Sequence, residues 1–470
     1  MGFIIAIDIM VVCILVLVAC RQGFERALPL AACLLVLFPE ESKITIPGLF
    51  DLTTQRFILL ALIVLCFTTG KRTKDGPRKL PLRAGILAWI LWWGLAAANS
   101  VVPWVSVKTV LSEIFDFFVI YYIFCMYVSK TQTAKRVLFG IVTGLVACSV
   151  LGLLESYANW TVVSLFPRIV HRSGVSGSVY VDMSRGIRAQ STFGHPILLG
   201  SALAMTVPMA LYLVSISRST AQRWFLWSGI LLMFACIYKT GSRGPWIALA
   251  LSLGTLLVFN KARVRKYLVV IALLTVSVLV VRPGVGETIW NNYIATLDKN
   301  STQGESYQYR YALYDLAVRE LDRSVRRAIF GYGPESFYFL KITGEFNGRV
   351  MTFVSCDNSI AALLIETGYL GLLIAMSVLA TALVRAYRKC RRVGPRANGI
   401  YLVLFVSMAT FVFMMTNVAI LGWGQENFIF WIVMALSMTY PRLAALEQKR
   451  KSETALARPP ALVCVGESAQ

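Results

Sequence analysis

Two arginines and one aspartate lie at polar breaks between apolar segments, where side chains could act on a ligand at a membrane surface. Arg243 lies in a short stretch between Gly241 and Gly244, and these glycines let a bulky ligand approach the backbone. Arg310 lies inside the long polar interval 282–357. Asp357 closes that interval and could act as a general base or orient an acceptor hydroxyl. Chemistry outside the membrane is therefore expected around this interval.

Each of these residues also has a purely structural interpretation. An arginine at a membrane boundary often anchors its helix, as Arg243 would, and Arg310 could solvate the edge of an amphipathic helix. Asp357 could cap the helix that follows it, because a side-chain carboxylate accepts hydrogen bonds from first-turn amides. The excess of basic residues on the cytoplasmic side of membrane proteins disfavours an outer arginine without a function.

Further candidates are a histidine and several acids. His195 precedes Pro196 at the start of an apolar segment, and it is one of only two histidines. No ligand spacing indicates a metal site, so we expect none. Glu113 and Asp116 are expected on one face of a helix, and Glu155 near the end of the next. Acids in membrane segments are functional candidates, although pairing with a basic neighbour is the alternative.

Composition places the chain among multi-pass membrane proteins. Of 470 residues, 57% are hydrophobic, which is more apolar surface than a water-soluble domain could bury. The net charge of +22 comes largely from short basic clusters between apolar segments, as topology signals do, so we expect no nucleic-acid binding. Most of the 10 cysteines fall inside apolar runs and indicate no disulfide framework. The first apolar run lacks the features of a cleaved signal peptide and is interpreted as a retained span.

The predicted fold is an all-α integral membrane protein with 12–13 transmembrane helices and one long outer loop. Apolar runs that could span lie at 3–20, 56–70, 83–101, 108–128, 136–157, 197–216, 224–239, 244–260, 266–281, 358–384, 399–418 and 424–440. The shorter run 27–38 could be a thirteenth span or a re-entrant element. The predicted parts are N-terminal helices 1–281, a loop 282–357, C-terminal helices 358–440 and a polar, disordered tail 441–470.

Basic clusters orient these spans. Five clusters are separated by pairs of spans, so one choice places all of them in the cytoplasm and the interval 282–357 outside. Within that interval Tyr307, Tyr311, Tyr314, Val318, Leu321 and Val325 recur at helical spacing. They predict an amphipathic helix at the membrane surface, with Arg310 on the border of its apolar stripe.

Several short motifs, in their order and spacing, resemble the O-antigen ligase and polymerase superfamily of bacterial membrane glycosyltransferases. The resemblance covers roughly residues 188–371. Its motifs are Phe193-Gly194-His195-Pro196, Thr240-Gly241-Ser242-Arg243-Gly244, Tyr309-Arg310-Tyr311, Gly331-Tyr332-Gly333-Pro334, Asp357-Asn358 and Glu366-Thr367-Gly368-Tyr369-Leu370-Gly371.

The resemblance implies an inverting, metal-independent glycosyltransferase of the bacterial inner membrane, with its active face periplasmic and no cofactor. Its partners would be an undecaprenyl-diphosphate-linked glycan as donor, a glycan or glycolipid as acceptor, and membrane lipids. Arg243 and Arg310 would bind the diphosphate, because guanidinium groups neutralise developing negative charge bidentately. Asp357 would act on the acceptor. His195, Arg188, Asn358 and Tyr309 would bind substrate.

One departure from the family pattern concerns the acceptor. Where ligases of this family typically have a histidine before the asparagine, this chain has Asp357, which favours a polymerase-like member or another acceptor. The sequence does not decide between ligase and polymerase. A transporter or flippase for lipid-linked glycans is the alternative, and it predicts charges that line a path through the spans. A membrane scaffold without chemistry would leave the two outer arginines unexplained.

Overall fold

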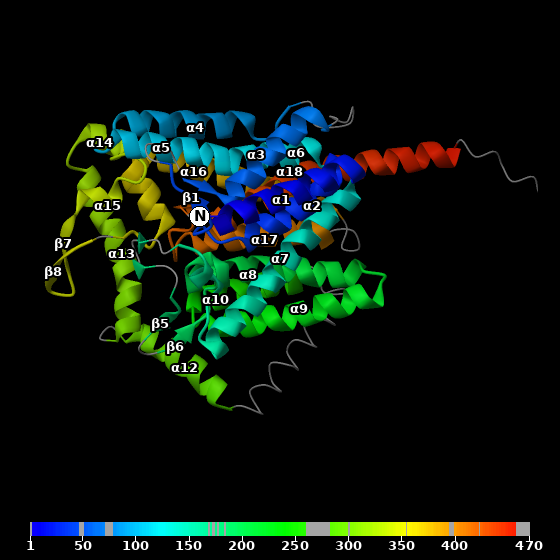
Figure 1. The fold of residues 1–470 in the computed structure, drawn as a ribbon. Coiled ribbons are helices and arrows are strands. Elements are labelled where there is room, and N and C mark those ends of the chain that lie inside the picture. The colour runs from blue at the N-terminus through cyan, green and yellow to red at the C-terminus, as the bar shows by residue number, and fades with distance from the viewer. Residues whose placement is uncertain are drawn as a thin grey trace, which may run out of the picture.

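The structure, a computed structural model, is a bundle of long helices (Figure 1). It describes residues 2–46, 51–70, 79–167, 170–171, 174–175, 178–182, 185–259, 283–298, 301–353, 355–393, 399–422 and 424–456.

Apolar helices build the bundle and confirm the predicted all-α integral membrane protein. In the described ranges, seven helical segments are long and apolar enough to cross a membrane. They are α1 (Gly2–Gln22), α5 to α6 (Pro103–Tyr127), α7 (Thr131–Ala158), α8 (Pro196–Ile216), α9 (Thr220–Lys239), α16 (Ser359–Arg392) and α18 (Gly424–Leu456). Shorter apolar helices accompany them: α3 (Thr54–Thr68), α4 (Arg83–Ala98), α10 (Arg243–Phe259) and α17 (Gly399–Met414). The predicted span 266–281 lies outside the described residues.

The short apolar run 27–38, expected to be either a thirteenth span or a re-entrant element, lies mostly within helix α2 (Phe24–Leu37). Gly23, with a φ of 90°, turns the chain back directly after α1. A Cβ on Gly140 of α7 would lie 2.1 Å from the carbonyl oxygen of Pro29, so the backbones of α2 and α7 touch. Its 14 residues make a helix about 21 Å long, shorter than the roughly 30 Å hydrocarbon core. Helix α2 is thus a short element packed within the bundle.

Helix α8 lies at the centre of the bundle. Its most apolar window is 94% buried, and it packs against α7, α9, α10 and α17. The Ser407 hydroxyl of α17 donates to the carbonyl oxygen of Met205, at 2.8 Å. Because α8 is enclosed on all sides, residues at its N-terminal end are held in a fixed position.

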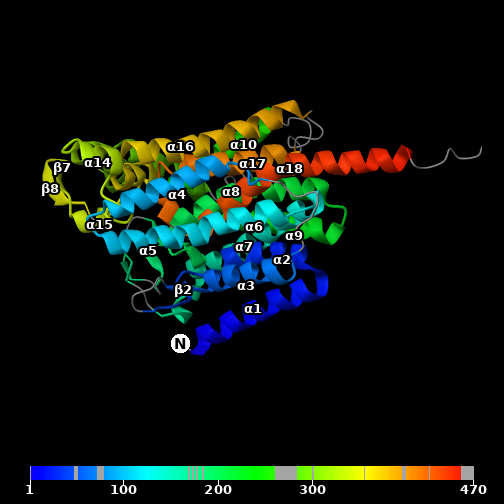
Figure 2. The ribbon, with the colours of Figure 1, turned by 90° about the horizontal axis from the view of Figure 1, so that it is seen from above.

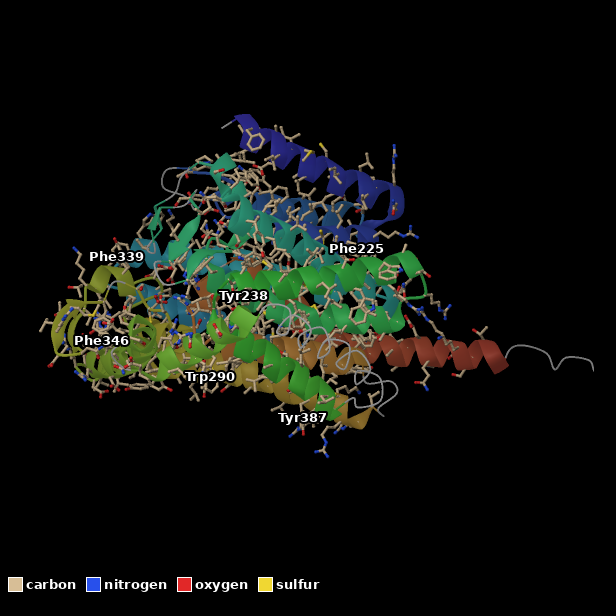
Figure 3. All side chains as sticks on the ribbon, turned by 90° about the horizontal axis from the view of Figure 1, so that it is seen from below. Phe225, Tyr238, Trp290, Phe339, Phe346 and Tyr387 are labelled. Atoms are coloured by element: carbon tan, nitrogen blue, oxygen red, sulfur yellow. The ribbon has the colours of Figure 1, made fainter. Side chains whose placement is uncertain are left out.

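The interval 282–357 forms a compact layer at one end of the bundle. Its elements are α12 (Pro283–Leu297), α13 (Thr302–Leu321), α14 (Val325–Phe330), α15 (Phe337–Leu340), β7 (Thr343–Phe346) and β8 (Arg349–Thr352). Figures 1 and 2 place α14, α15, β7 and β8 at this end and the C-terminal part of α18 at the other. In Figure 3, Phe339 and Phe346 lie at this end, whereas Phe225 of α9 and Tyr387 of α16 lie at the opposite end.

The predicted apolar stripe on the helix that carries Arg310 is partly correct. Two of its residues, Leu321 and Tyr314, pack in the core of this layer, and Leu313 and Leu316 join them against α16 and the β7–β8 hairpin. Tyr311 is 58% exposed, and Val325 begins a separate helix, α14, where it is 78% exposed. The buried face of α13 is therefore rotated from the predicted stripe.

The two glycine motifs of this region meet at a kink in α16. Gly368 has φ 72° and ψ −178°, which interrupts the helix and frees the carbonyls before it. The amides of Tyr332 and Gly333 donate to the carbonyl oxygens of Ile365 and Glu366, both at 2.9 Å. The indole of Trp92 donates to the next carbonyl, that of Thr367. The glycine motifs therefore join the loop layer to the bundle.

Replacing Gly368 with alanine should destabilise the protein. A Cβ there would lie 2.3 Å from the carbonyl oxygen of Ile329, and the backbone conformation is one that only glycine adopts readily. We expect a loss of about 2 kcal/mol or more in the free energy of unfolding, seen as a lower unfolding temperature in detergent. The matched control is Gly254→Ala in α10, where a Cβ meets nothing within 4 Å. Equal unfolding temperatures for both variants would contradict the kink assignment.

Short antiparallel hairpins occupy the connections that the structure describes. They pair β1 (Lys43–Ile44) with β2 (Leu52–Thr53), β3 (Val170–His171) with β4 (Gly174–Val175), β5 (Tyr180–Asp182) with β6 (Gly186–Arg188), and β7 with β8. Single turns of other helix types are η1 (Ile114–Phe118), η2 (Val162–Leu165), η3 (Ser191–Phe193) and η4 (Ile420–Gly422). The β5–β6 hairpin matters most here, because it carries Arg188.

The C-terminal segment differs from the predicted disordered tail. Helix α18 continues through Pro441 to Leu456, and Leu443 beyond the proline is 3% exposed. A proline is tolerated within a packed membrane helix because neighbouring groups can satisfy the backbone carbonyl that it leaves free, and the residues that follow are strong helix formers. The predicted tail after Leu456 lies outside the described residues.

Candidate functional site

Arg243 is placed by the turn between α9 and α10. Helix α9 ends as the amide of Thr240 donates to Cys236, and Gly241 adopts a φ of 58°. Pro245 packs closely on α8, where a Cβ on Gly200 would lie 2.7 Å from it. Arg243 is the first residue of α10, so its side chain stands at the end of the bundle that carries the 282–357 layer.

Arg188 ties the β5–β6 hairpin to this turn. It is 4% exposed. Its Nε donates to the carbonyl oxygen of Thr240 and its Nη2 to the hydroxyl of Ser242, each at 2.7 Å. Its guanidinium carbon lies 5.2 Å from the centre of the Tyr180 ring, the residue opposite it in the hairpin. Burial, and then the positive charge of Arg185, lower the pKa of Arg188 to about 10. Arg188 thus stays a cation.

His195 caps the N-terminus of α8. Its Nδ1 accepts the amide of Ile197 at 3.2 Å, so a neutral ring carries its proton on Nε2. Burial, and then the charges of Arg188, Arg310 and Arg185, lower the pKa of His195 to about 3. His195 is therefore a neutral hydrogen-bond donor at neutral pH. The sequence analysis placed it correctly at the entrance to a span.

Arg310 reaches the same place from helix α13. Its Nε donates to the carbonyl oxygen of Asn417, in the turn after α17, at 2.8 Å. Burial lowers the pKa of Arg310, while the charge of Asp357 opposes that shift. The preceding residue, Tyr309, donates to the carbonyl oxygen of Ser355 and stacks on Phe353 at 5.3 Å. Tyr309 therefore fixes the helix relative to the segment that carries Asp357.

Asn358, and not Asp357, caps helix α16. The side-chain oxygen of Asn358 accepts the amides of Ile360 and Ala361, at 3.0 and 3.2 Å, and also the Tyr314 hydroxyl. Its side-chain nitrogen donates to the carbonyl oxygen of Thr416. The structural role that the sequence offered to Asp357 thus belongs to its neighbour, because the first helical turn starts one residue later. Asp357 itself is exposed, and its charge acts on Arg310 and Tyr309.

The predicted site residues fall into two groups. Arg188, His195, Arg243, Arg310 and Asp357 come together. Arg188 bonds to Thr240 and Ser242 just before Arg243, and Tyr180 contacts both Arg188 and His195. Arg310 donates to the carbonyl oxygen of Asn417, and Asn358, the neighbour of Asp357, donates to that of Thr416. Asn358 and Tyr309, by contrast, use their polar atoms to hold α16 and α13 in place. Guanidinium groups gathered beside one exposed carboxylate can bind an anionic group and present a base to a neighbouring hydroxyl.

Comparison with known families bears on this arrangement. Residues 228–376 match a family model described as O-antigen ligase. No curated protein matches the chain. The matched segment, about a third of the chain, runs from α9 into α16, and it includes Arg243, Arg310 and Asp357, whereas Arg188 and His195 precede it. The match supports an enzyme of the O-antigen ligase and polymerase superfamily, and the apolar helices make it a multi-pass membrane protein.

Arg185 also lies at this site, and the sequence analysis missed it. It lies in the turn of the β5–β6 hairpin, where its Nε donates to Asp182 and its Nη1 to the carbonyl oxygen of Gly241, at 2.9 and 3.0 Å. Its charge acts on Arg188, His195, Arg243 and Arg310. The one signal in the sequence was the spacing of Asp182, Arg185 and Arg188 just before the motif around His195. We call Arg185, Arg188, Arg243 and Arg310 the arginine cluster.

The acids in the membrane segments have mainly structural partners. Asp116 pairs with Arg56, whose Nη2 lies 2.7 Å from the carboxylate, as the alternative interpretation predicted. Glu155 accepts the amides of Gln190 and Ser191, at 2.9 and 2.8 Å, and so anchors the segment before His195. Glu113 lies near Glu366 of the α16 kink. Within the described ranges, no group of three or more His, Cys, Asp and Glu side chains could hold a metal ion.

Proposed function

We propose that the protein transfers a saccharide from a lipid diphosphate to a sugar hydroxyl at the periplasmic face of the bacterial inner membrane. The observation that carries the proposal is that three separate elements meet at the turn after α17. Arg310 donates to the carbonyl oxygen of Asn417, Asn358 next to Asp357 donates to that of Thr416, and a Cβ on Gly244, next to Arg243, would lie 3.4 Å from the side chain of Asn417. The O-antigen ligase match supports this class of reaction. The natural donor would be an undecaprenyl-diphosphate-linked glycan.

The chemistry follows from the charges at the site. The acceptor hydroxyl attacks the anomeric carbon from the face opposite the diphosphate, so the configuration inverts. Its proton passes to Asp357, and the bond between the anomeric carbon and the phosphate oxygen breaks. The electron pair of that bond stays on the leaving diphosphate, which gains negative charge. Arg243 and Arg310 stabilise this charge, so the proposed step needs no metal ion.

The surroundings of Arg243 and Arg310 suit such a role. The guanidinium of Arg310 is held before the donor arrives, because its Nε donates to the carbonyl oxygen of Asn417. The backbone of Arg243 is fixed by its place at the start of α10. Their mutual repulsion, together with that of Arg185, disfavours the unliganded site and is relieved by an anion. Preorganised charges of this kind need no rearrangement as negative charge develops.

A transfer assay tests the proposal. Purified protein in detergent is incubated with a lipid-diphosphate-linked oligosaccharide and a saccharide or glycolipid acceptor, and the products are separated by mass. We expect a longer or relocated saccharide together with free lipid diphosphate. A protein that only moves the donor across vesicle membranes, and leaves its covalent structure intact, would instead be a transporter. The acceptor that is consumed distinguishes a ligase from a polymerase.

A further inference from the structure

Helix α13 holds the segment around Asp357 with two tyrosine hydrogen bonds. The Tyr309 hydroxyl donates to the carbonyl oxygen of Ser355 at 2.9 Å, and the Tyr314 hydroxyl donates to the side-chain oxygen of Asn358 at 3.0 Å. Residues on both sides of Asp357 are thus bonded to one helix, at positions about 7.5 Å apart along its axis. The exposed carboxylate of Asp357 therefore lies alongside this part of α13.

Tyr311 places an accessible aromatic ring on the same stretch of α13. It lies three residues before Tyr314, so the two side chains share a face of the helix. Tyr314 is half-buried and bonded to Asn358, whereas Tyr311 is 58% exposed. Packing on α16 leaves this ring at the surface, within one helical turn of the residue that contacts the Asp357 segment.

Arg310 and Tyr311 leave α13 in different directions. Successive residues of an α-helix point about 100° apart. Arg310 reaches the turn after α17, where its Nε donates to the carbonyl oxygen of Asn417, and so joins the arginine cluster. Figure 1 shows α13 running across the direction of the bundle helices, so this helix lies over the end of the bundle. Tyr311 is therefore at the border of the arginine cluster.

An accessible aromatic ring beside a carboxylate suits a sugar. The C–H bonds on one face of a pyranose ring carry small positive charges, and the face of an aromatic ring carries negative charge. Stacking the two rings also removes apolar surface of both from water. The arginine cluster suits the anionic diphosphate of the donor instead. Donor and acceptor would thus meet different side chains of the same helix.

Lipid is the other occupant that an exposed aromatic ring could meet. An acyl chain packed beside Arg310 and Asp357 would remove these charges from water without a partner, which is costly. A surface that suits lipid lies on α12, where Trp290, Tyr293 and Ile294 are exposed together, as is typical of a membrane interface. The position of Tyr311 favours the acceptor sugar.

From this arrangement we infer that Tyr311 binds the acceptor: its ring stacks against the acceptor sugar and presents the reacting hydroxyl to Asp357. The inference rests on the proposed saccharide transfer, and it deepens that function by giving the class of acceptor. The acceptor is a pyranose with one face of C–H bonds free to stack. Tyr314 is a positioning residue, because its hydroxyl holds Asn358 next to Asp357.

Separate Michaelis constants for acceptor and donor test the inference, with the acceptor that wild-type protein consumes in the transfer assay. We expect Tyr311→Ala to raise KM for the acceptor about five- to tenfold and to leave KM for the lipid-diphosphate donor within about twofold of wild type. Tyr311→Phe and Tyr311→Trp keep a ring and should stay close to wild type. Tyr311→Leu keeps an apolar side chain without a ring, and it should behave like Tyr311→Ala.

Tyr293→Ala is the matched control, because Tyr293 is 56% exposed in the same layer and packs beside Trp290 on α12. It should change KM for neither substrate. If Tyr311→Ala unfolds in detergent, Tyr311→Leu carries the test. A wild-type acceptor KM in Tyr311→Leu would overturn the inference and would fit a contact with lipid, and an equal rise in KM for both substrates would overturn it as well.

The same assay separates this inference from the proposed function. If wild-type protein transfers saccharide and the Tyr311 variants bind the acceptor normally, only the role of Tyr311 is wrong. If wild-type protein transfers none, the proposed function fails and the inference fails with it.

Discussion

Replacing Arg243 or Arg310 with alanine should lower saccharide transfer by about 100- to 1000-fold, which corresponds to roughly 2.7–4 kcal/mol of transition-state stabilisation. The expected loss is large because, in the proposed reaction, each guanidinium would stabilise a phosphate whose charge rises as the glycosidic bond breaks. The effect should appear mainly in kcat, since that charge is greatest in the transition state. Transfer rates of purified variants, at equal abundance in the membrane, measure it.

Conservative changes separate charge from geometry. Lysine at either position keeps one positive charge but loses the planar fork, so an intermediate rate is expected. The double alanine variant should lose less than the sum of the single losses if both arginines bind the same phosphate. Arg323→Ala is the matched control, because Arg323 is an exposed arginine on the same layer that pairs with Glu320. Near-normal transfer by both single alanine variants would refute the assigned roles.

The sequence indicated candidate site residues best where polar residues lie between apolar segments. Arg243 and Asp357 could be selected because each stands where a span begins, and membrane boundaries leave few polar positions to choose from. Helix existence was predictable for the same reason, since the hydrocarbon core requires long apolar runs. These local signals do not indicate which distant residues meet in the fold. The sequence around Arg310 does not indicate, for example, that its Nε donates to the carbonyl oxygen of Asn417, more than 100 residues away.

Other features depended on choices that local sequence leaves open. Asp357 and Asn358 are equally good helix caps, and the start of the first helical turn decides between them. Helix α13 has apolar residues around most of its circumference, and only packing on α16 decides that Leu313 and Leu316 are buried while Tyr311 is exposed. The strands of the β5–β6 hairpin have three residues each, too few for an alternating pattern to be recognised. Arg185 was missed for that reason.

The motif that contains Gly331 and Gly333 has a structural role. It contributed to the family resemblance, which assigned no role to its residues. In the structure its amides satisfy carbonyls at the α16 kink, and a Cβ on Gly331 would lie 2.4 Å from the backbone of Glu366. A motif can thus mark a family because it builds the support of a site. The residues that meet the substrate are then the charged ones carried by the supported helices.

The second large effect concerns Asp357. Asp357→Asn should lower transfer by about 100- to 10,000-fold, because asparagine cannot accept the acceptor proton. The fold should be unaffected, since the helix cap lies on Asn358 and Asp357 is exposed. Asp357→His should regain much of the rate, because a neutral imidazole is also a base and ligases of this family typically have histidine here. Glu345→Gln, an exposed acid of β7 in the same layer, is the matched control.

Comparison with Asp357→Ala decides which of two tasks the carboxylate performs. Asparagine can still hydrogen-bond to an acceptor hydroxyl, whereas alanine can neither orient it nor take its proton. If Asp357 is the base, the asparagine and alanine variants should be equally slow, and only histidine should restore transfer. If Asp357 instead orients the acceptor, asparagine should keep most of the rate and alanine should lose it. In that case the proton must leave by another route, and the charge of Asp357 would serve chiefly to hold Arg310 against the diphosphate.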